Sequence, residues 1–396
     1  MGIVLSNLKA AYNKNAIVNV YRLDEIFFTG YVYLLDEDSE ELVMRTYDEW
    51  GMPDGMVYLD LSMVYDVEVD NSADLRHMKR RIQLAKDYHF KEIAENKLMP
   101  LDKLASLRLE ILGRSYVDGQ IVMITIDNPE GIDNTYKGLI DSVDAEKVEI
   151  TVVNKTNFSD HTKHTLDLSA IMTIEFLGKE LTMLTKNKEL LFGPSIETVE
   201  VHGDAPQIPT IFEHSRAKHQ LFEIESAADN GYYYIGYVVN YNEEFVIFNL
   251  VTMSGQFGGY VLLRTSMVTH IYTDSDYLRL INQFTSENKA ADTFLEPVLN
   301  DERVFDMKSD PLATLLEQAI NLNRLVRVAA PKSMGLLGYP LDITPITKQV
   351  HFQEVDDTRE GLEKPVAMPL SQIGELAFDY LEAFLTDDGL KNQREI

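Results

Sequence analysis

The sequence predicts a mainly β protein with short helices, organised as four tandem small five-stranded barrels, each preceded by an α-helix. Pairs of alternating apolar runs joined by short polar turns recur four times along the 396 residues. A glycine lies within or beside the first run of every pair, and a helical pattern precedes each group of strands. The recurring glycines are Gly30, Gly138, Gly236 and Gly338.

The sequence that follows each glycine repeats as well. Six residues after it comes a turn-type residue: Asp36, Asp144, Asn242 and Thr344. A second alternating run comes next, and about thirty residues after each glycine a serine precedes a final short strand. These serines are Ser62, Ser169, Ser266 and Ser371. A further short run closes at each of these serines, and one more run lies upstream of each glycine, so every repeat holds five short strands.

Five short strands cannot bury both faces as a flat sheet, whereas a bent sheet that closes on itself can. The second strand of such a barrel has to bend sharply, and a residue without a side chain permits a bend or a bulge. We therefore interpret Gly30, Gly138, Gly236 and Gly338 as structural corners rather than as ligand-binding residues.

Helical patterns precede the groups of strands at residues 4–12, 101–112, 208–217 and 309–320. In the last of these, Asp310 can cap the helix and Pro311 suits its first position. A longer helix is expected over residues 72–100. The predicted domains are residues 1–98, which end with this long helix, and residues 99–193, 206–294 and 308–396.

A helix followed by five strands, with a glycine in the second strand and an Asp six residues later, resembles the Sm-like small β-barrel family. The matching pairs are Gly30 with Asp36, Gly138 with Asp144 and, loosely, Gly236 with Asn242. The resemblance implies four divergent copies of this fold. In that family a later Asn and an Arg-Gly in the last turn form an RNA base pocket. Here Glu40 occupies the Asn place and the last turn reads Asp-Leu-Ser at 60–62, which puts the RNA pocket in doubt.

Composition limits the classes of function. The chain has no cysteine, so disulfides and thiolate chemistry are excluded, and a reducing, cytoplasmic location is expected. The chain contains no run of eighteen apolar residues, so no membrane-spanning helix is predicted. The net charge is −28, which opposes binding to phosphate backbones.

No catalytic motif stands out in the sequence. A nucleophile elbow, a phosphate-binding loop and a dinucleotide fingerprint are all missing, so we expect a non-enzymatic protein without a cofactor. Tandem barrels present repeated loops and edges, which favours a scaffold whose partner is another protein. Three loop aromatics could anchor that partner or instead close the barrel cores: Trp50, Phe158 and Phe257.

Two further patterns were weighed against this interpretation. A basic cluster on the predicted helix at 76–91 could instead bind RNA, although no aromatic platform accompanies it. Its members are Arg76, Lys79, Arg80, Arg81, Lys86 and Lys91. His161 and His164 have a spacing that could hold a metal, but they lie in a loop and no third ligand follows nearby, so no metal site is predicted.

Overall fold

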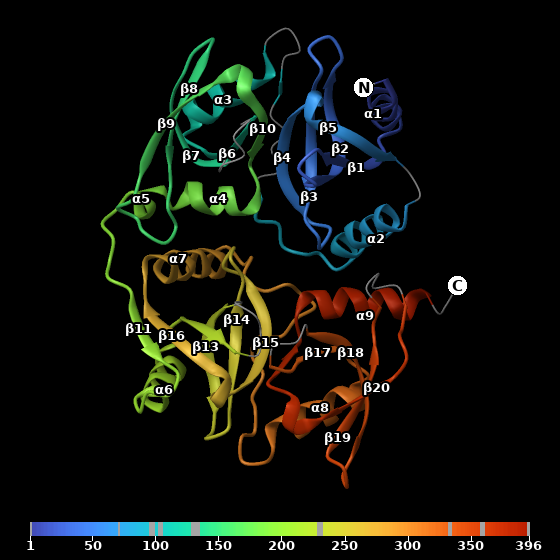
Figure 1. The fold of residues 1–396 in the computed structure, drawn as a ribbon, viewed down its shortest axis with the longest axis vertical. Coiled ribbons are helices and arrows are strands. Elements are labelled where there is room, and N and C mark those ends of the chain that lie inside the picture. The colour runs from blue at the N-terminus through green and yellow to red at the C-terminus, as the bar shows by residue number, and fades with distance from the viewer. Residues whose placement is uncertain are drawn as a thin grey trace. The chain divides into compact units, whose positions relative to one another are not determined.

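The computed structural model describes residues 2–69, 72–94, 100–101, 106–127, 135–227, 233–331, 335–356 and 361–393 (Figure 1). Over these ranges the protein is mainly β, with two large antiparallel sheets and nine α-helices. The chain divides into two compact units, Met1–Ser195 and Ile196–Ile396, and each unit contains one of the sheets.

The sheet of the first unit has ten strands in the order β5-β1-β2-β3-β4-β10-β6-β7-β8-β9. We call β1–β5 the first segment and β6–β10 the second. The first segment comprises β1 (Ile17–Arg22), β2 (Phe27–Asp36), β3 (Glu41–Tyr47), β4 (Pro53–Asp60) and β5 (Val64–Val69). The second comprises β6 (Ile121–Ile126), β7 (Thr135–Val143), β8 (Lys147–Val152), β9 (Thr162–Asp167) and β10 (Ile171–Phe176).

The sheet of the second unit repeats this order and adds one strand at its edge: β11-β16-β12-β13-β14-β15-β21-β17-β18-β19-β20. The added strand is β11 (Val199–His202). The third segment comprises β12 (Phe222–Ser226), β13 (Tyr233–Tyr241), β14 (Phe245–Val251), β15 (Phe257–Arg264) and β16 (Val268–Asp274). The fourth comprises β17 (Val326–Ala329), β18 (Leu336–Thr344), β19 (Gln349–Glu354), β20 (Val366–Pro369) and β21 (Glu375–Phe378).

A helix precedes each segment, as the sequence predicts. These helices are α1 (Gly2–Lys14), α3 (Leu107–Asp118), α6 (Ile208–Lys218) and α8 (Pro311–Leu322). In α8 the side chain of Asp310 accepts a hydrogen bond from the Ala313 amide at 3.1 Å, which is the predicted cap. The helix predicted at 101–112 begins only at Leu107, and residues 102–105 lie outside the described ranges.

A second helix follows the last strand of every segment. These are α2 (Ala73–Asp87), α4 (Lys179–Lys186), which α5 (Lys188–Leu191) follows, α7 (Asp276–Ala290) and α9 (Leu381–Gln393). Only α2 was expected, and the prediction that it runs over 72–100 is wrong, because it ends at Asp87. Its end has a physical cause: the Tyr88 amide caps the last turn, and His89 then adopts a φ of 55°.

The pairing between segments differs from the prediction of four separately closed barrels. In the first unit β4 pairs with β10, so that Leu59 lies opposite Thr173 and Met56 opposite Phe176. Within the described residues β4 therefore joins the next segment instead of closing onto β5, and ten strands form one open sheet. Strands β15 and β21 join the third and fourth segments in the same way.

The four glycines have the same neighbours in all four segments. Each lies in the second strand, where an added Cβ would meet a carbonyl oxygen of the third strand at 2.0, 2.1, 2.3 and 2.7 Å, in chain order. The carbonyls belong to Arg45, Thr151, Asn249 and Gln353. The pairing register shifts just after each glycine, as it does between Val32 and Leu34. Close approach of the neighbouring backbone, next to a bulge, is therefore what requires glycine.

Candidate functional site

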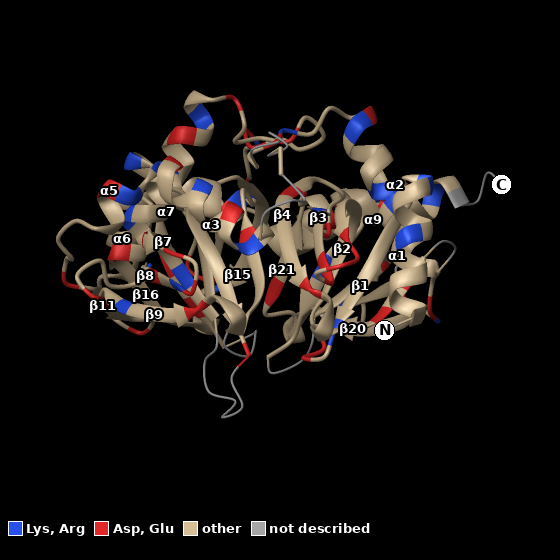
Figure 2. Cartoon of the chain, turned by 90° about the horizontal axis from the view of Figure 1, so that it is seen from above, with Lys and Arg blue, Asp and Glu red and all other residues tan. Residues whose placement is uncertain are grey.

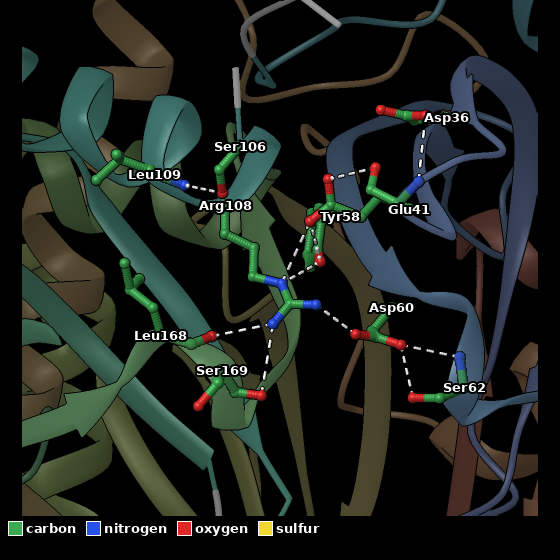
Figure 3. A network of polar contacts seen from close by, with 11 residues as sticks. Asp36, Glu41, Tyr58, Asp60, Ser62, Ser106, Arg108, Leu109, Leu168 and Ser169 are labelled. Carbon is green, nitrogen blue, oxygen red and sulfur yellow. Dashed lines mark hydrogen bonds and ion pairs between the residues drawn. The ribbon is translucent and has the colours of Figure 1, made fainter. Parts of the chain in front are cut away.

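The junction of the first and second segments is held by Arg108 of α3 (Figure 3). Its guanidinium donates to the Tyr58 hydroxyl and to the Asp60 carboxylate of β4. It also donates to the carbonyl oxygen of Leu168, at 3.1 Å, in the 3₁₀ turn (Leu168–Ala170) that precedes β10. We call this set of contacts the Arg108 network. It links three elements of two segments through one planar cation.

Buried acceptors complete the Arg108 network. The Tyr58 hydroxyl donates to Oε1 of Glu41 at 2.9 Å, and both residues are buried. Burial and the adjacent Glu41 carboxylate raise the pKa of Tyr58 far above its ordinary value, so the hydroxyl remains a donor. The Arg108 guanidinium forms ion pairs with both Glu41 and Asp60.

An arginine occupies the equivalent junction in the second unit. Arg264 is the last residue of β15 and occupies the position that Asp60 occupies at the end of β4. Each comes directly after the last leucine of its junction, Leu263 or Leu59. Arg264 donates to the carbonyl oxygens of Leu370 at 3.0 Å and of Ile373 at 2.8 Å. Leu370 opens a 3₁₀ turn (Leu370–Gln372) that is equivalent to Leu168–Ala170 in the first unit. In each unit an arginine, from a helix in one case and a strand in the other, thus binds the carbonyl of the leucine that opens this turn.

A pocket of about 380 Å³ lies at the junction in the first unit, and we call it the junction pocket. Both segments and α2 contribute apolar walls, from residues that include Phe28, Met56, Met78, Met123 and Phe176. Four acidic residues, Glu49, Asp54, Glu175 and Glu180, also line it, together with Lys137. Apolar walls with a few convergent polar groups are typical of a small-molecule site.

Burial gives three of these carboxyl groups, those of Asp54, Glu175 and Glu180, different protonation behaviour. It raises the pKa of Glu175 to about 7, and it raises the pKa of Asp54, whose Oδ1 accepts from the Lys179 amide at 2.8 Å. Burial also acts on Glu180, but its ion pairs with Lys137 and Lys155 outweigh burial and lower the pKa of that carboxyl. The junction pocket therefore holds one carboxyl that exchanges a proton near neutral pH beside one that stays ionised.

The three aromatics predicted to lie in loops have different surroundings, and Phe257 is the first residue of β15 rather than a loop residue. Phe158 is fully buried and Phe257 is 4% exposed, so both side chains lie in the core and offer no surface to a partner. Trp50 is partly exposed, and the Arg81 guanidinium lies 5.6 Å from the centre of its ring. Of the three, Trp50 is the residue that a partner could reach.

The predicted basic cluster consists of five residues of α2 (Lys and Arg are blue in Figure 2) and of Lys91, which lies beyond the end of this helix, and its members differ in exposure. Arg81 is buried and donates to the carbonyl oxygen of Glu49, which fixes the turn between β3 and β4 to the helix. Arg76 and Lys86 are exposed, whereas Lys79, Arg80 and Lys91 are partly buried. The cluster is therefore not one continuous basic face.

His161 and His164, the two histidines considered as metal ligands, contact different neighbours. The His161 ring packs on Phe192 with centroids 4.7 Å apart, and His164 contacts the Thr162 hydroxyl at 3.0 Å. A different group of residues, Glu200, His202 and His270, brings metal-ligating atoms together in the described part of the second unit. The sequence did not predict this group, because β11 lies between the predicted domains 99–193 and 206–294.

The outer edges of the two sheets are the remaining candidates for binding. Within the described residues, β9 pairs only with β8 and β20 pairs only with β19. Strands β9 and β20 are the fourth strands of their segments, as β4 and β15 are in the first and third segments. Five of the six residues of β9 are exposed or partly exposed.

Comparison with known proteins assigns no family to the chain. No family model matches the sequence. A search of curated proteins finds no match either. Separately, none of the helices in the described ranges is long and apolar enough to cross a membrane.

Proposed function

We propose that this protein is a non-enzymatic scaffold built from four divergent Sm-like segments, and that it binds an extended strand of another protein along β9. The order of helix, five strands and corner glycine supports the Sm-like assignment. The observation that carries the binding proposal is the pairing of β4 with β10, because it is an edge-to-edge junction between two segments.

The same junction is made twice. Residues Met56 to Leu59 of β4 pair with Thr173 to Phe176, and residues Tyr260 to Leu263 of β15 pair with Glu375 to Phe378. In both units the fourth strand of a segment accepts an antiparallel strand from the next segment. Strand β9 is the fourth strand of the second segment, so it presents the same kind of edge to a strand from outside the chain.

Strand addition supplies affinity through the backbone. An edge strand carries a row of N–H and C=O groups that a partner's strand can pair, while alternate side chains set specificity. Lys163 is exposed and His164 is partly exposed on β9. These polar residues keep the edge from pairing indiscriminately and match a partner strand of complementary polarity.

The test is affinity purification of the full chain from its native host, with nuclease treatment in one arm. We expect a protein partner that survives nuclease. Two single variants, Lys163→Pro and His164→Pro, then locate the contact. Neighbouring residues of a strand direct their N–H groups to opposite sides, so only one variant removes a donor from the outer edge.

The proline variant that removes an N–H donor from the outer edge of β9 should keep the wild-type unfolding transition and should no longer bind the partner. Lys163→Ala is the matched control, because it removes the side chain and keeps the backbone donor. If both proline variants captured the partner at wild-type levels, the edge of β9 would be ruled out as the binding site. Loss of the bound material on nuclease treatment would instead favour the RNA alternative.

A further inference from the structure

Three side chains with metal-ligating atoms converge on strands β11 and β16 of the second unit. Glu200 and His202 lie two residues apart on β11, so they point to the same face of the strand. His270 of β16 lies directly opposite His202 in the antiparallel register. One ligand atom from each of the three residues lies within 4.8 Å of the others.

The orientation of His270 fits metal binding. Its Nδ1 lies 2.9 Å from Oε2 of Glu225, and its Nε2 lies 3.5 Å from Oε1 of Glu200. When Nδ1 donates its proton to Glu225, the lone pair of Nε2 is directed toward Glu200. Metal-binding histidines take this arrangement, in which a carboxylate holds the nitrogen that does not bind the metal.

Glu225 is itself held in place. The Tyr272 hydroxyl donates to its Oε1 at 3.2 Å, and Glu225 lies on the neighbouring strand β12. The rings of His202 and His270 have centroids 4.9 Å apart. Three strands therefore position two imidazoles and one carboxylate, together with the carboxylate that orients one imidazole.

We propose that Glu200, His202 and His270 form a site for a divalent transition metal of the zinc class. Two imidazole nitrogens and one carboxylate oxygen are ligands that Zn²⁺ accepts in a four-coordinate site, with water in the fourth position. Nitrogen ligands disfavour Ca²⁺ and Mg²⁺, which prefer all-oxygen sites. A metal bound here would link β11 to β16 through its ligands, and so fix β11 along the edge of the sheet.

The probes are Co²⁺ and Zn²⁺, each added alone to the full chain after removal of metals with a chelator. One equivalent of Co²⁺ should give the visible absorption of a four-coordinate site, and Zn²⁺ should abolish it by displacement. His270→Ala and Glu200→Gln should each lose this signal. Glu225→Gln keeps all three ligands and should weaken binding by about 10- to 100-fold.

His164→Ala is the matched control, because His164 is a partly exposed strand histidine outside the cluster. It should bind Co²⁺ as the wild type does. Glu200 is exposed, so its glutamine variant keeps the fold, and Zn²⁺ should raise the melting temperature of the wild type but not of this variant. Unchanged Co²⁺ binding in both His270→Ala and Glu200→Gln, or no spectral signal in the wild type, would overturn the proposal.

Discussion

Arg108 donates a hydrogen bond to the carbonyl oxygen of Leu168 at 3.1 Å, and the same guanidinium contacts Tyr58 and Asp60 of the preceding segment. In the other unit, Arg264 donates to the carbonyl of Leu370 at 3.0 Å. Both junctions thus combine strand pairing with one arginine that satisfies backbone carbonyls. Strand pairing sets the register, and the arginine links the turn of one segment to the fourth strand of the other.

Arg108→Ala should lower the free energy of unfolding of the first unit by about 3 kcal/mol, because it leaves the carboxylates of Glu41 and Asp60 without their cation. Chemical denaturation followed by Trp50 fluorescence measures this, since Trp50 is the only tryptophan and reports on the first unit. Arg114→Ala is the control. It lies on the same helix, pairs with Glu110 at a partly exposed site, and should cost only about 0.5 kcal/mol.

Gly30→Ala should destabilise the first unit by roughly 1–3 kcal/mol, because its Cβ would lie 2.0 Å from the Arg45 carbonyl oxygen and β2 and β3 would have to separate. Gly113→Ala is the control. It lies in α3, where an added Cβ meets nothing within 4 Å, and it should stabilise the unit by about 0.5–1 kcal/mol. Equal stability of the two variants would contradict the close-approach explanation of the corner glycines.

Glu175→Gln should change how stability depends on pH. Burial raises the pKa of Glu175 from 4.5 to about 7, so the folded protein holds this proton more tightly than the unfolded chain. The stability that the proton contributes is complete below pH 4.5 and is lost as the pH rises through about 7. The glutamine variant stays neutral, so at pH 8 it should exceed the wild type by roughly 2 kcal/mol.

At pH 4.5 the Glu175→Gln variant and the wild type should be about equally stable. Denaturant titrations at several pH values, followed by Trp50 fluorescence, measure the difference. Glu149→Gln, an exposed change on β8, is the control for replacing a glutamate by a glutamine. A constant difference between Glu175→Gln and the wild type from pH 4.5 to 8 would show that Glu175 is ionised throughout this range.

Arg81→Ala should lower the stability of the first unit by about 2 kcal/mol and shift the emission of Trp50. The substitution removes a buried bond to the Glu49 carbonyl and the cation that packs against the Trp50 ring. Lys86→Ala, an exposed change on the same helix, should alter stability by less than about 0.5 kcal/mol. Salt-sensitive RNA binding that both variants weaken equally would instead support the RNA alternative.

Local sequence signals predicted much of the fold. Alternation, turn residues and caps predicted a mainly β chain with five short strands in each segment and a helix before them, because these patterns depend on neighbouring residues. The helix α7 could also have been found, since Ser275 caps it and Leu278, Ile281 and Phe284 share one face. The predicted domain 206–294 contains α7, but no helix was expected after the last strand of that repeat.

The junctions and sites were harder to predict because they depend on residues far apart in the chain. Nothing local in β4 indicates that Leu59 pairs with Thr173 rather than with its own segment. The junction pocket and the Arg108 network follow from that pairing. The group of Glu200, His202 and His270 likewise depends on β11 pairing with β16, although the alternation in residues 199–202 was a usable strand signal.

The β4–β10 pairing has a consequence for the newly made chain. Strand β4 leaves the ribosome first, and its partner emerges only after α2, α3 and β6 to β9 have been synthesised. Until then the nascent first segment exposes an edge that can pair with other chains. Biogenesis of the first unit therefore includes a waiting period, during which a bound chaperone would limit aggregation.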